Sequence, residues 1–106
     1  MNQASPVLLY DLLILSTGYE LVAQKSTCKD ANGKRQQTQN LGKMLFEGCR
    51  SACKRLSSIL FKVARADSKY CEGELCFCSC YPEVYTDGHC KLMQWRTDDV
   101  WRIIEE

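Results

Sequence analysis

Cysteine is the residue type whose number and spacing could carry chemistry in this chain, because eight of its 106 residues are cysteines and only His89 is a histidine. Cysteines form disulfides, bind metals or act in redox catalysis, and each use has a typical spacing. The redox spacing Cys-x-x-Cys is absent. Structural zinc sites often use the same spacing together with further histidines. We therefore interpret the cysteines as a disulfide framework and expect no metal or cofactor.

A zinc site and a cysteine nucleophile are the alternatives to a disulfide framework. The zinc site would use the closely spaced group Cys76, Cys78, Cys80, His89 and Cys90. A nucleophile would pair Cys49 with His89, but a cysteine inside a disulfide framework is oxidised and inert. Since a single histidine leaves few candidate general bases, we expect that the protein is not an enzyme.

The most informative spacing is Cys49-x3-Cys53 together with Cys76-x-Cys78. Residues four apart project from one face of a helix, about 5–6 Å apart. Residues two apart share one face of a strand at a similar distance. The two spacings match, so two parallel disulfides could join a helix to a strand without strain.

Hydrophobic patterning predicts the elements that position these cysteines. We expect a strand over 19–24, a polar loop over 29–40 with an Asn-Gly turn, and a hairpin over 69–81 whose turn is at 72–74. Apolar residues at helical spacing predict one helix from residue 41 to 63, on the face formed by Leu41, Leu45, Cys49, Ala52, Cys53, Leu56, Leu60 and Val63. Thr97, followed by two acidic residues, predicts the start of a helix in the tail.

Length and charge indicate one small secreted domain. The net charge is +1, which argues against a dedicated nucleic-acid binder. Residues 25–69 carry 11 basic and 3 acidic side chains, whereas residues 70–106 carry 3 basic and 8 acidic ones. The apolar run at 7–15 is too short to span a bilayer and predicts a signal peptide over residues 1–17. Together with the cysteines, it predicts secretion.

Residues 18–91 resemble the scorpion long-chain sodium-channel toxin family. The matching stretches are Gly18-Tyr19-Glu20-Leu21-Val22, Lys25-Ser26-Thr27-Cys28-Lys29, Cys49-x3-Cys53, Tyr70-Cys71-x4-Cys76-x-Cys78 and Cys90. The cysteine spacings alone are typical of the wider cysteine-stabilised αβ class, which includes defensins. The Gly-Tyr opening and the Lys-Ser-Thr stretch make the narrower match more specific. The resemblance implies a mature domain over 18–91 and leaves 92–106 as a C-terminal extension.

The resemblance also implies an α+β fold, small and disulfide-rich, with one helix on a three-stranded antiparallel sheet. It implies the pairs Cys28–Cys90, Cys49–Cys76 and Cys53–Cys78. The family's second cysteine, the partner of the one at position 71, is missing here, and Cys80 is extra. Cys71 and Cys80 would then be free or would join two chains into a dimer.

A shifted set of pairs is equally compatible with the strand faces, because a shift of two residues along a strand preserves the face. This set is Cys28–Cys90, Cys49–Cys78, Cys53–Cys80 and Cys71–Cys76. We favour the family pairing over it.

The resemblance implies a venom peptide that binds the extracellular voltage-sensor loops of a voltage-gated sodium channel and modifies inactivation, with the membrane only as the setting of the target. The matching contact positions, with two nearby tyrosines, are Tyr19, Gln24, Lys25, Ser26, Thr27, Tyr85, His89 and Lys91. One alternative is a defensin-like antimicrobial peptide that acts on anionic membranes through the basic segment 25–69. Another is a disulfide-linked dimeric signalling peptide that uses Cys71 or Cys80.

Overall fold

The computed structural model describes residues 18–104, so the expected signal peptide over residues 1–17 lies outside the described residues. In chain order the elements are β1 (Tyr19–Ala23), β2 (Ser26–Lys29), β3 (Gln39–Met44), α2 (Phe46–Arg55), β4 (Leu60–Ala64), β5 (Cys71–Glu72), β6 (Leu75–Cys80), β7 (Lys91–Gln94) and β8 (Asp98–Ile103). No helix in this range is long and apolar enough to cross a membrane.

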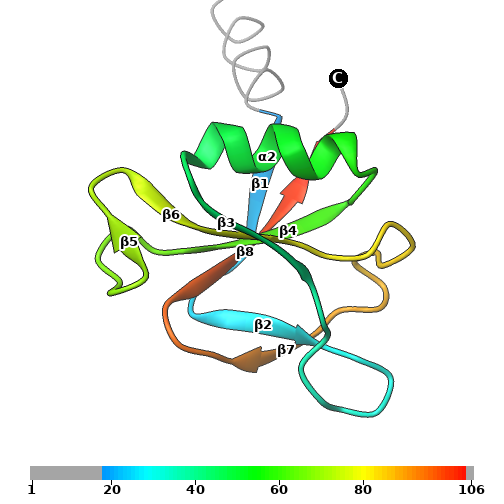
Figure 1. The fold of residues 1–106 in the computed structure, drawn as a ribbon. Coiled ribbons are helices and arrows are strands. Elements are labelled where there is room, and N and C mark those ends of the chain that lie inside the picture. Colours follow the sequence, from blue (N-terminus) through cyan, green and yellow to red (C-terminus); the bar gives the residue numbers. More distant parts are fainter. Residues whose placement is uncertain (1–17, 105–106) are drawn as a thin grey trace, which may run out of the picture.

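The strands form two antiparallel sheets with the helix on one side (Figure 1). The main sheet has the order β1-β8-β4-β6-β3, and the short strand β5 pairs with β6. Strands β2 and β7 form a separate two-stranded ribbon. Helix α2 covers one face of the main sheet and the ribbon lies below the opposite face (Figure 1).

The expected three-stranded sheet with one helix is therefore wrong. The described residues contain eight strands, six of them in the main sheet, and one short helix. The strand at 19–23 and the hairpin around 72–74 are confirmed. Both have local signals, alternation in the first case and a tight turn in the second, whereas the other strands depend on partners far away in the sequence.

The helix predicted from residue 41 to 63 spans only Phe46–Arg55. Before it, Gly42 has a φ of +83° in a bulge of β3, which a helix does not allow. After it, Ser57 has a φ of +63° and ends the helical path. The apolar positions 60 and 63 belong to β4, every residue of which is buried. A fully buried strand reads as a continuous run and can imitate helical spacing.

The segment expected to be a C-terminal extension contains two strands. Its first part lies in β7, which pairs with β2, and its last part is β8, which lies between β1 and β4 in the main sheet. The helix predicted to start at Thr97 is wrong, because the chain enters β8 there. The neighbouring strands provide backbone partners on both sides of β8, and this pairing outweighs the local capping signal.

The disulfides are the shifted set, so the pairing that the resemblance implies is wrong at two of its three bonds. Cys49 joins Cys78, Cys53 joins Cys80 and Cys71 joins Cys76, whereas Cys28–Cys90 is common to both sets. Cys71 and Cys76 lie directly opposite each other in the hairpin. Every cysteine is paired within the chain, which leaves none for a bond between two copies.

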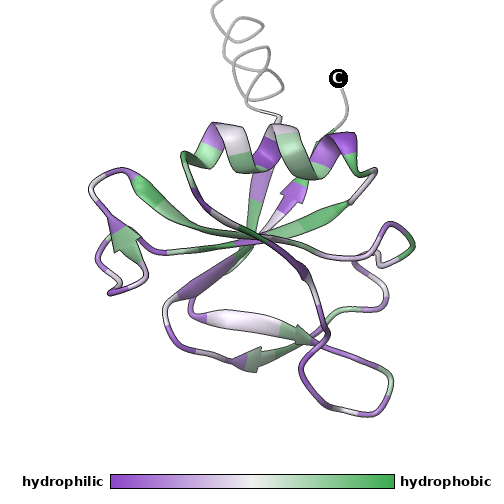
Figure 2. Cartoon of the chain, viewed as in Figure 1, coloured by the Kyte–Doolittle hydropathy of each residue, from purple (hydrophilic) through white to green (hydrophobic). Residues whose placement is uncertain are grey.

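Each face of the main sheet has its own core. On the helix side, Phe61 and Val63 of β4 alternate with residues that face away, and they pack with the helix-to-strand disulfides. On the other side, Leu60, Tyr81 and Val100 pack between the main sheet and the ribbon, together with Cys28. Figure 2 shows hydrophobic residues along β4 and mostly hydrophilic ones along the loop between β2 and β3. The ribbon covers only part of its face, and the side chains that line the remaining part are mainly polar or charged.

Candidate functional site

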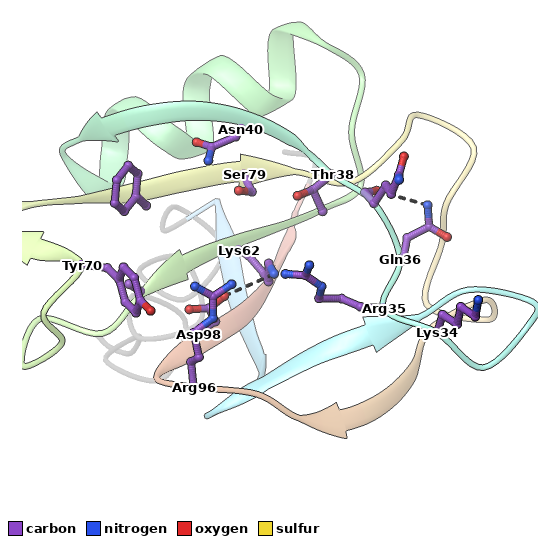
Figure 3. A pocket seen from close by; sticks show the side chains of 13 residues that line it. Lys34, Arg35, Gln36, Thr38, Asn40, Lys62, Tyr70, Ser79, Arg96 and Asp98 are labelled. Carbon is purple, nitrogen blue, oxygen red and sulfur yellow. Dashed lines mark hydrogen bonds and ion pairs between the residues drawn. The ribbon is translucent and has the colours of Figure 1, made fainter.

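A cleft of about 610 Å³ occupies the polar part of the sheet face that points away from the helix (Figure 3). Its floor comes from β4 and β6, whose residues alternate between the helix side and the cleft. The segment before β3, the start of β3 and the chain just before β8 form the walls. The lining residues are Lys34, Arg35, Gln36, Gln37, Thr38, Asn40, Lys62, Ala64, Tyr70, Phe77, Ser79, Arg96 and Asp98.

Lys62 is the buried charge at the base of the cleft, with a side chain that is 7% exposed. Its Nζ lies 3.2 Å from Oδ2 of Asp98 and donates a hydrogen bond to Oγ1 of Thr27 at 3.1 Å. Oγ1 of Thr27 lies 3.0 Å from the hydroxyl of Tyr81, which accepts the backbone N–H of Cys28. A buried ammonium is stable only when such partners replace water. This network fixes Lys62 and joins the floor of the cleft to the ribbon.

Two arginines at the rim stack on the indole ring of Trp95. The guanidinium carbon of Arg35 lies 4.3 Å from the ring centroid, and that of Arg96 lies 4.7 Å from it. The two guanidiniums are therefore at most 9.0 Å apart, the sum of these distances. Stacking holds a guanidinium by its flat face, so its N–H groups can still bind; Arg96 uses part of this edge in a hydrogen bond to the Tyr70 hydroxyl. Within residues 18–104, neither arginine pairs with a carboxylate.

The positive charges of Arg35 and Arg96 affect the pKa of Lys62. Burial lowers the pKa of its ammonium, Asp98 opposes this effect, and Arg35 and Arg96 lower the pKa further. Figure 3 shows the side chains of Arg35, Lys62 and Arg96 pointing toward one another near Asp98. Three cations thus lie close together, and the single carboxylate of the lining, Asp98, pairs with only one of them, Lys62. Such a concentration of like charge gives the cleft a positive potential.

An aromatic wall stands beside the cations. The rings of Tyr70 and Phe77 are 6.2 Å apart between centroids, and the guanidinium of Arg96 lies 4.9 Å from the Tyr70 ring. A hydrogen bond from Arg96 lowers the pKa of the Tyr70 hydroxyl. Arg96 therefore contacts both the charged and the aromatic parts of the cleft.

None of the eight residues predicted to contact a receptor lines this cleft. Gln24, Lys25 and Ser26 are at the turn between β1 and β2, where they line a smaller and shallower pocket. Thr27 is fully buried and serves the Lys62 network. Tyr19 packs edge-on against Phe46 on the helix side of the sheet.

The predicted receptor contacts comprise two patches, the first at the turn after β1 and the second, His89 and Lys91, next to Cys90 at the other end of the ribbon. Ser26 pairs with Gln94, whereas Lys29 pairs with Lys91, so the two patches are separated by the length of β2, about 10 Å. His89 and Lys91 are exposed there. Tyr85 is buried and stacks between Tyr81 and His89. The Cys28–Cys90 bond joins the two strands, but it does not place the two patches side by side.

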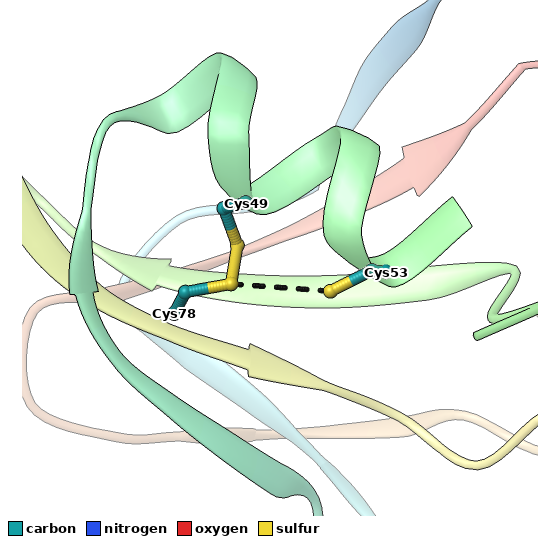
Figure 4. A group of neighbouring side chains, drawn as sticks. All are labelled: Cys49, Cys53 and Cys78. Carbon is teal, nitrogen blue, oxygen red and sulfur yellow. Dashed lines mark hydrogen bonds between the residues drawn. A yellow bond between two sulfur atoms is a disulfide. The ribbon is translucent and has the colours of Figure 1, made fainter. Parts of the chain in front are cut away.

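The sulfur atoms of Cys49, Cys53 and Cys78 gather within 4.8 Å of one another beneath the helix (Figure 4). The distance between the sulfurs of Cys53 and Cys78 is 3.9 Å, a contact between two neighbouring disulfides. Disulfide sulfurs are not thiolates and do not ligate zinc in the manner of a structural site. The alternative zinc site is excluded on the same ground, because its cysteines are all oxidised.

Sequence reasoning missed the cleft, and the comparisons with known proteins do not supply it. The chain matches no family model, no curated protein and no solved structure. The only sequence signal was the excess of basic residues in 25–69, which contains Lys34, Arg35 and Lys62. Arg96 lies in the expected extension, and no local pattern links it to the others.

Proposed function

We propose that this protein is an extracellular binding protein without catalytic activity, and that its ligand is an anion held in the cleft. The observation that carries this proposal is the clustering of three cations, Arg35, Lys62 and Arg96, in a cleft whose lining contains a single carboxylate, Asp98, which pairs with Lys62. The burial of Lys62 makes this arrangement costly for folding. A bound anion would offset the repulsion among the three cations.

The disulfides and the rigidity of the site support this proposal. Four disulfides indicate folding in an oxidising, extracellular or secreted setting. The floor of the cleft consists of strand residues, and Trp95 orients the two arginines before any ligand arrives. Preorganised groups bind with a smaller loss of entropy than mobile ones.

The sodium-channel hypothesis stays a prediction based on the sequence motifs. The fold that accompanied it is wrong, and two of its expected contacts, Thr27 and Tyr85, are buried. Whole-cell recording tests it, since unchanged gating at micromolar protein would remove it. The defensin-like alternative is tested by leakage from anionic vesicles. The disulfide-linked dimer relied on Cys71 or Cys80, and both are bonded within the chain.

Calorimetric titration with inorganic pyrophosphate at low ionic strength tests the anion site. We expect the double variant Arg35→Gln/Arg96→Gln to bind pyrophosphate at least tenfold more weakly, because each charge-assisted hydrogen bond contributes about 1.5–3 kcal/mol. The matched control is Arg55→Gln/Lys91→Gln, which removes the same charge from exposed residues outside the cleft. The control should bind within twofold of the wild type.

Two results of this titration would contradict the proposal. One is that the wild-type protein shows no binding up to millimolar pyrophosphate. The other is that both double variants lose affinity equally, which would make the attraction a matter of net charge alone. Far-ultraviolet circular dichroism of all three proteins confirms that the fold is unchanged.

A further inference from the structure

We infer that the ligand of the cleft is a compact ring compound, of sugar or nucleoside size, that carries a phosphate or sulfate ester. This ligand class rests on the proposed function, because it assumes that the cleft binds an anion. Four features of the cleft lead to it: the spacing of the arginines, the aromatic wall, unpartnered polar groups, and the distribution of charge over the molecule.

The arginine pair matches a tetrahedral oxyanion. Arg35 and Arg96 both contact the ring of Trp95, and their guanidinium carbons lie within 9.0 Å of each other. Guanidinium forks bind phosphate and sulfate oxygens through two parallel hydrogen bonds. Lys62 is engaged with Asp98 and Thr27, so it adds potential from below and is less free to contact the ligand directly.

The aromatic wall offers apolar contact next to the oxyanion position. Phe77 is 36% exposed although it is a large apolar side chain, and its ring leans toward that of Tyr70 at an angle of 58°. Arg96 touches the Tyr70 ring, so a ligand bound by this arginine begins beside the wall. A ring attached to the oxyanion can pack there.

Polar side chains of the floor and walls of the cleft remain available to bind the ring of the ligand. The hydroxyls of Thr38 and Ser79 have no hydrogen-bond partner within residues 18–104. The side-chain oxygen of Asn40 accepts the backbone N–H of Gly42, which leaves its amide N–H groups free. Ring hydroxyls or exocyclic groups are suitable partners for these hydroxyls and amides.

The charge distribution favours a compact ligand over a long polyanion. The lining carries four cationic side chains and one carboxylate, a net charge of +3. The whole chain is +1, so everything outside the cleft sums to −2. A long polyanion needs an extended basic track to neutralise its charges. Here the net positive charge is concentrated in the cleft lining, because the ten basic residues outside it are outnumbered by twelve acidic ones.

Competition against pyrophosphate tests this inference with two probes and their neutral parents. The probes are adenosine diphosphate, with adenosine as its parent, and a disulfated disaccharide, with the unsulfated disaccharide as its parent. We expect at least one probe to bind tenfold more tightly than pyrophosphate, and both neutral parents to bind at least tenfold more weakly than their charged forms. The tighter probe identifies the phosphate or the sulfate ester as the natural group.

The variant Phe77→Ala separates this inference from the proposed function. It should weaken the tighter probe about tenfold more than it weakens pyrophosphate, because the ring of the probe packs on the wall and pyrophosphate has no ring. If pyrophosphate binds in the cleft but no ring probe binds more tightly, the ring inference fails while the anion site stands. Tighter binding of a 20-nucleotide single-stranded DNA than of either probe would also overturn it, because that result would require a track beyond the cleft.

Discussion

At the residue scale, the positions most sensitive to substitution are buried polar side chains, because few other residue types could make the same hydrogen bonds. Tyr81 is 1% exposed, and its hydroxyl is the partner of both Thr27 and the Cys28 backbone. Burial raises the pKa of this hydroxyl, so it stays neutral near physiological pH. It joins the chain after β6 to the ribbon, at Thr27, the residue that accepts a hydrogen bond from Lys62.

Replacement of Tyr81 by phenylalanine tests this link. Tyr81→Phe leaves the buried N–H of Cys28 without its acceptor, and we expect the free energy of unfolding to fall by about 1–3 kcal/mol. Urea unfolding followed by circular dichroism measures the change. Tyr70→Phe is the control, because the Tyr70 hydroxyl faces the cleft (Figure 3), and it should change stability by less than about 0.5 kcal/mol. Equal effects of the two substitutions would argue against the network.

At the element scale, β8 shows how a local signal loses to pairing. Thr97 and the acids after it are good helix-start residues, yet the chain forms the strand between β1 and β4. The side chains of the consecutive residues Asp98 and Asp99 point to opposite faces, because side chains alternate along a strand. They therefore have different partners. Asp98 pairs with Lys62 in the cleft, and Asp99 accepts the backbone N–H of Lys25 at 3.2 Å.

Asp99 predicts a specific pH dependence. Burial raises the pKa of its carboxyl, and the N–H of Lys25 and the charge of Arg65 oppose this only in part. A raised acid pKa favours the folded state when the group is protonated, so that contribution is present below about pH 3.9 and is lost as the pH rises through the raised pKa. We expect Asp99→Asn, which cannot ionise and keeps an acceptor for Lys25, to gain stability relative to the wild type between pH 3 and pH 6.

Urea unfolding of both proteins across that pH range measures this difference. The free energy of unfolding of the variant minus that of the wild type should increase with pH. A difference that decreases with pH would mean that the ion pair with Arg65, at 3.9 Å, outweighs the burial of the carboxyl.

The elements also show how far the sequence could be interpreted. The hairpin at 71–80 and the strand at 19–23 follow from local turn and alternation signals. Strands β3, β4 and β8 do not, because their partners lie far away and β4 is buried on both faces. The cleft could not be predicted from local sequence patterns for the same reason. Lys62 was expected on a helix and Arg96 outside the domain, so nothing in the sequence placed them together.

At the scale of the whole molecule, the disulfides fix a different element on each face of the main sheet. Cys49–Cys78 and Cys53–Cys80 fix the helix on one face, and Cys28–Cys90 closes the ribbon on the other. The cysteine spacing predicted that a helix is joined to a strand by two parallel bonds, and this is confirmed. The sequence could not choose between registers two residues apart, because both place the cysteines on the same face.

Thiol counting decides between the two pairings in solution. The structure predicts no free thiol in the denatured, unreduced protein, and none after Cys71→Ala/Cys76→Ala, because that change removes one complete pair. In the chain-entropy model, loss of this five-residue loop costs about 2 kcal/mol of stability, compared with about 3.6 kcal/mol for either helix-to-strand bond. Two free thiols in each protein would instead indicate the pairing of the toxin family.

The most direct test of the central claim, that the ribbon leaves a cationic cleft on the sheet which binds an anion, is an amide nitrogen–proton NMR titration of the wild-type protein with pyrophosphate. We predict that the largest shifts fall in 34–38, 62–64, 77–79 and 96–98, the segments that surround the cleft. Helix α2 should change little, because it lies across the sheet from the cleft. Shifts concentrated on α2, or at the two ends of the β2–β7 ribbon around Lys25 and His89, would contradict the claim.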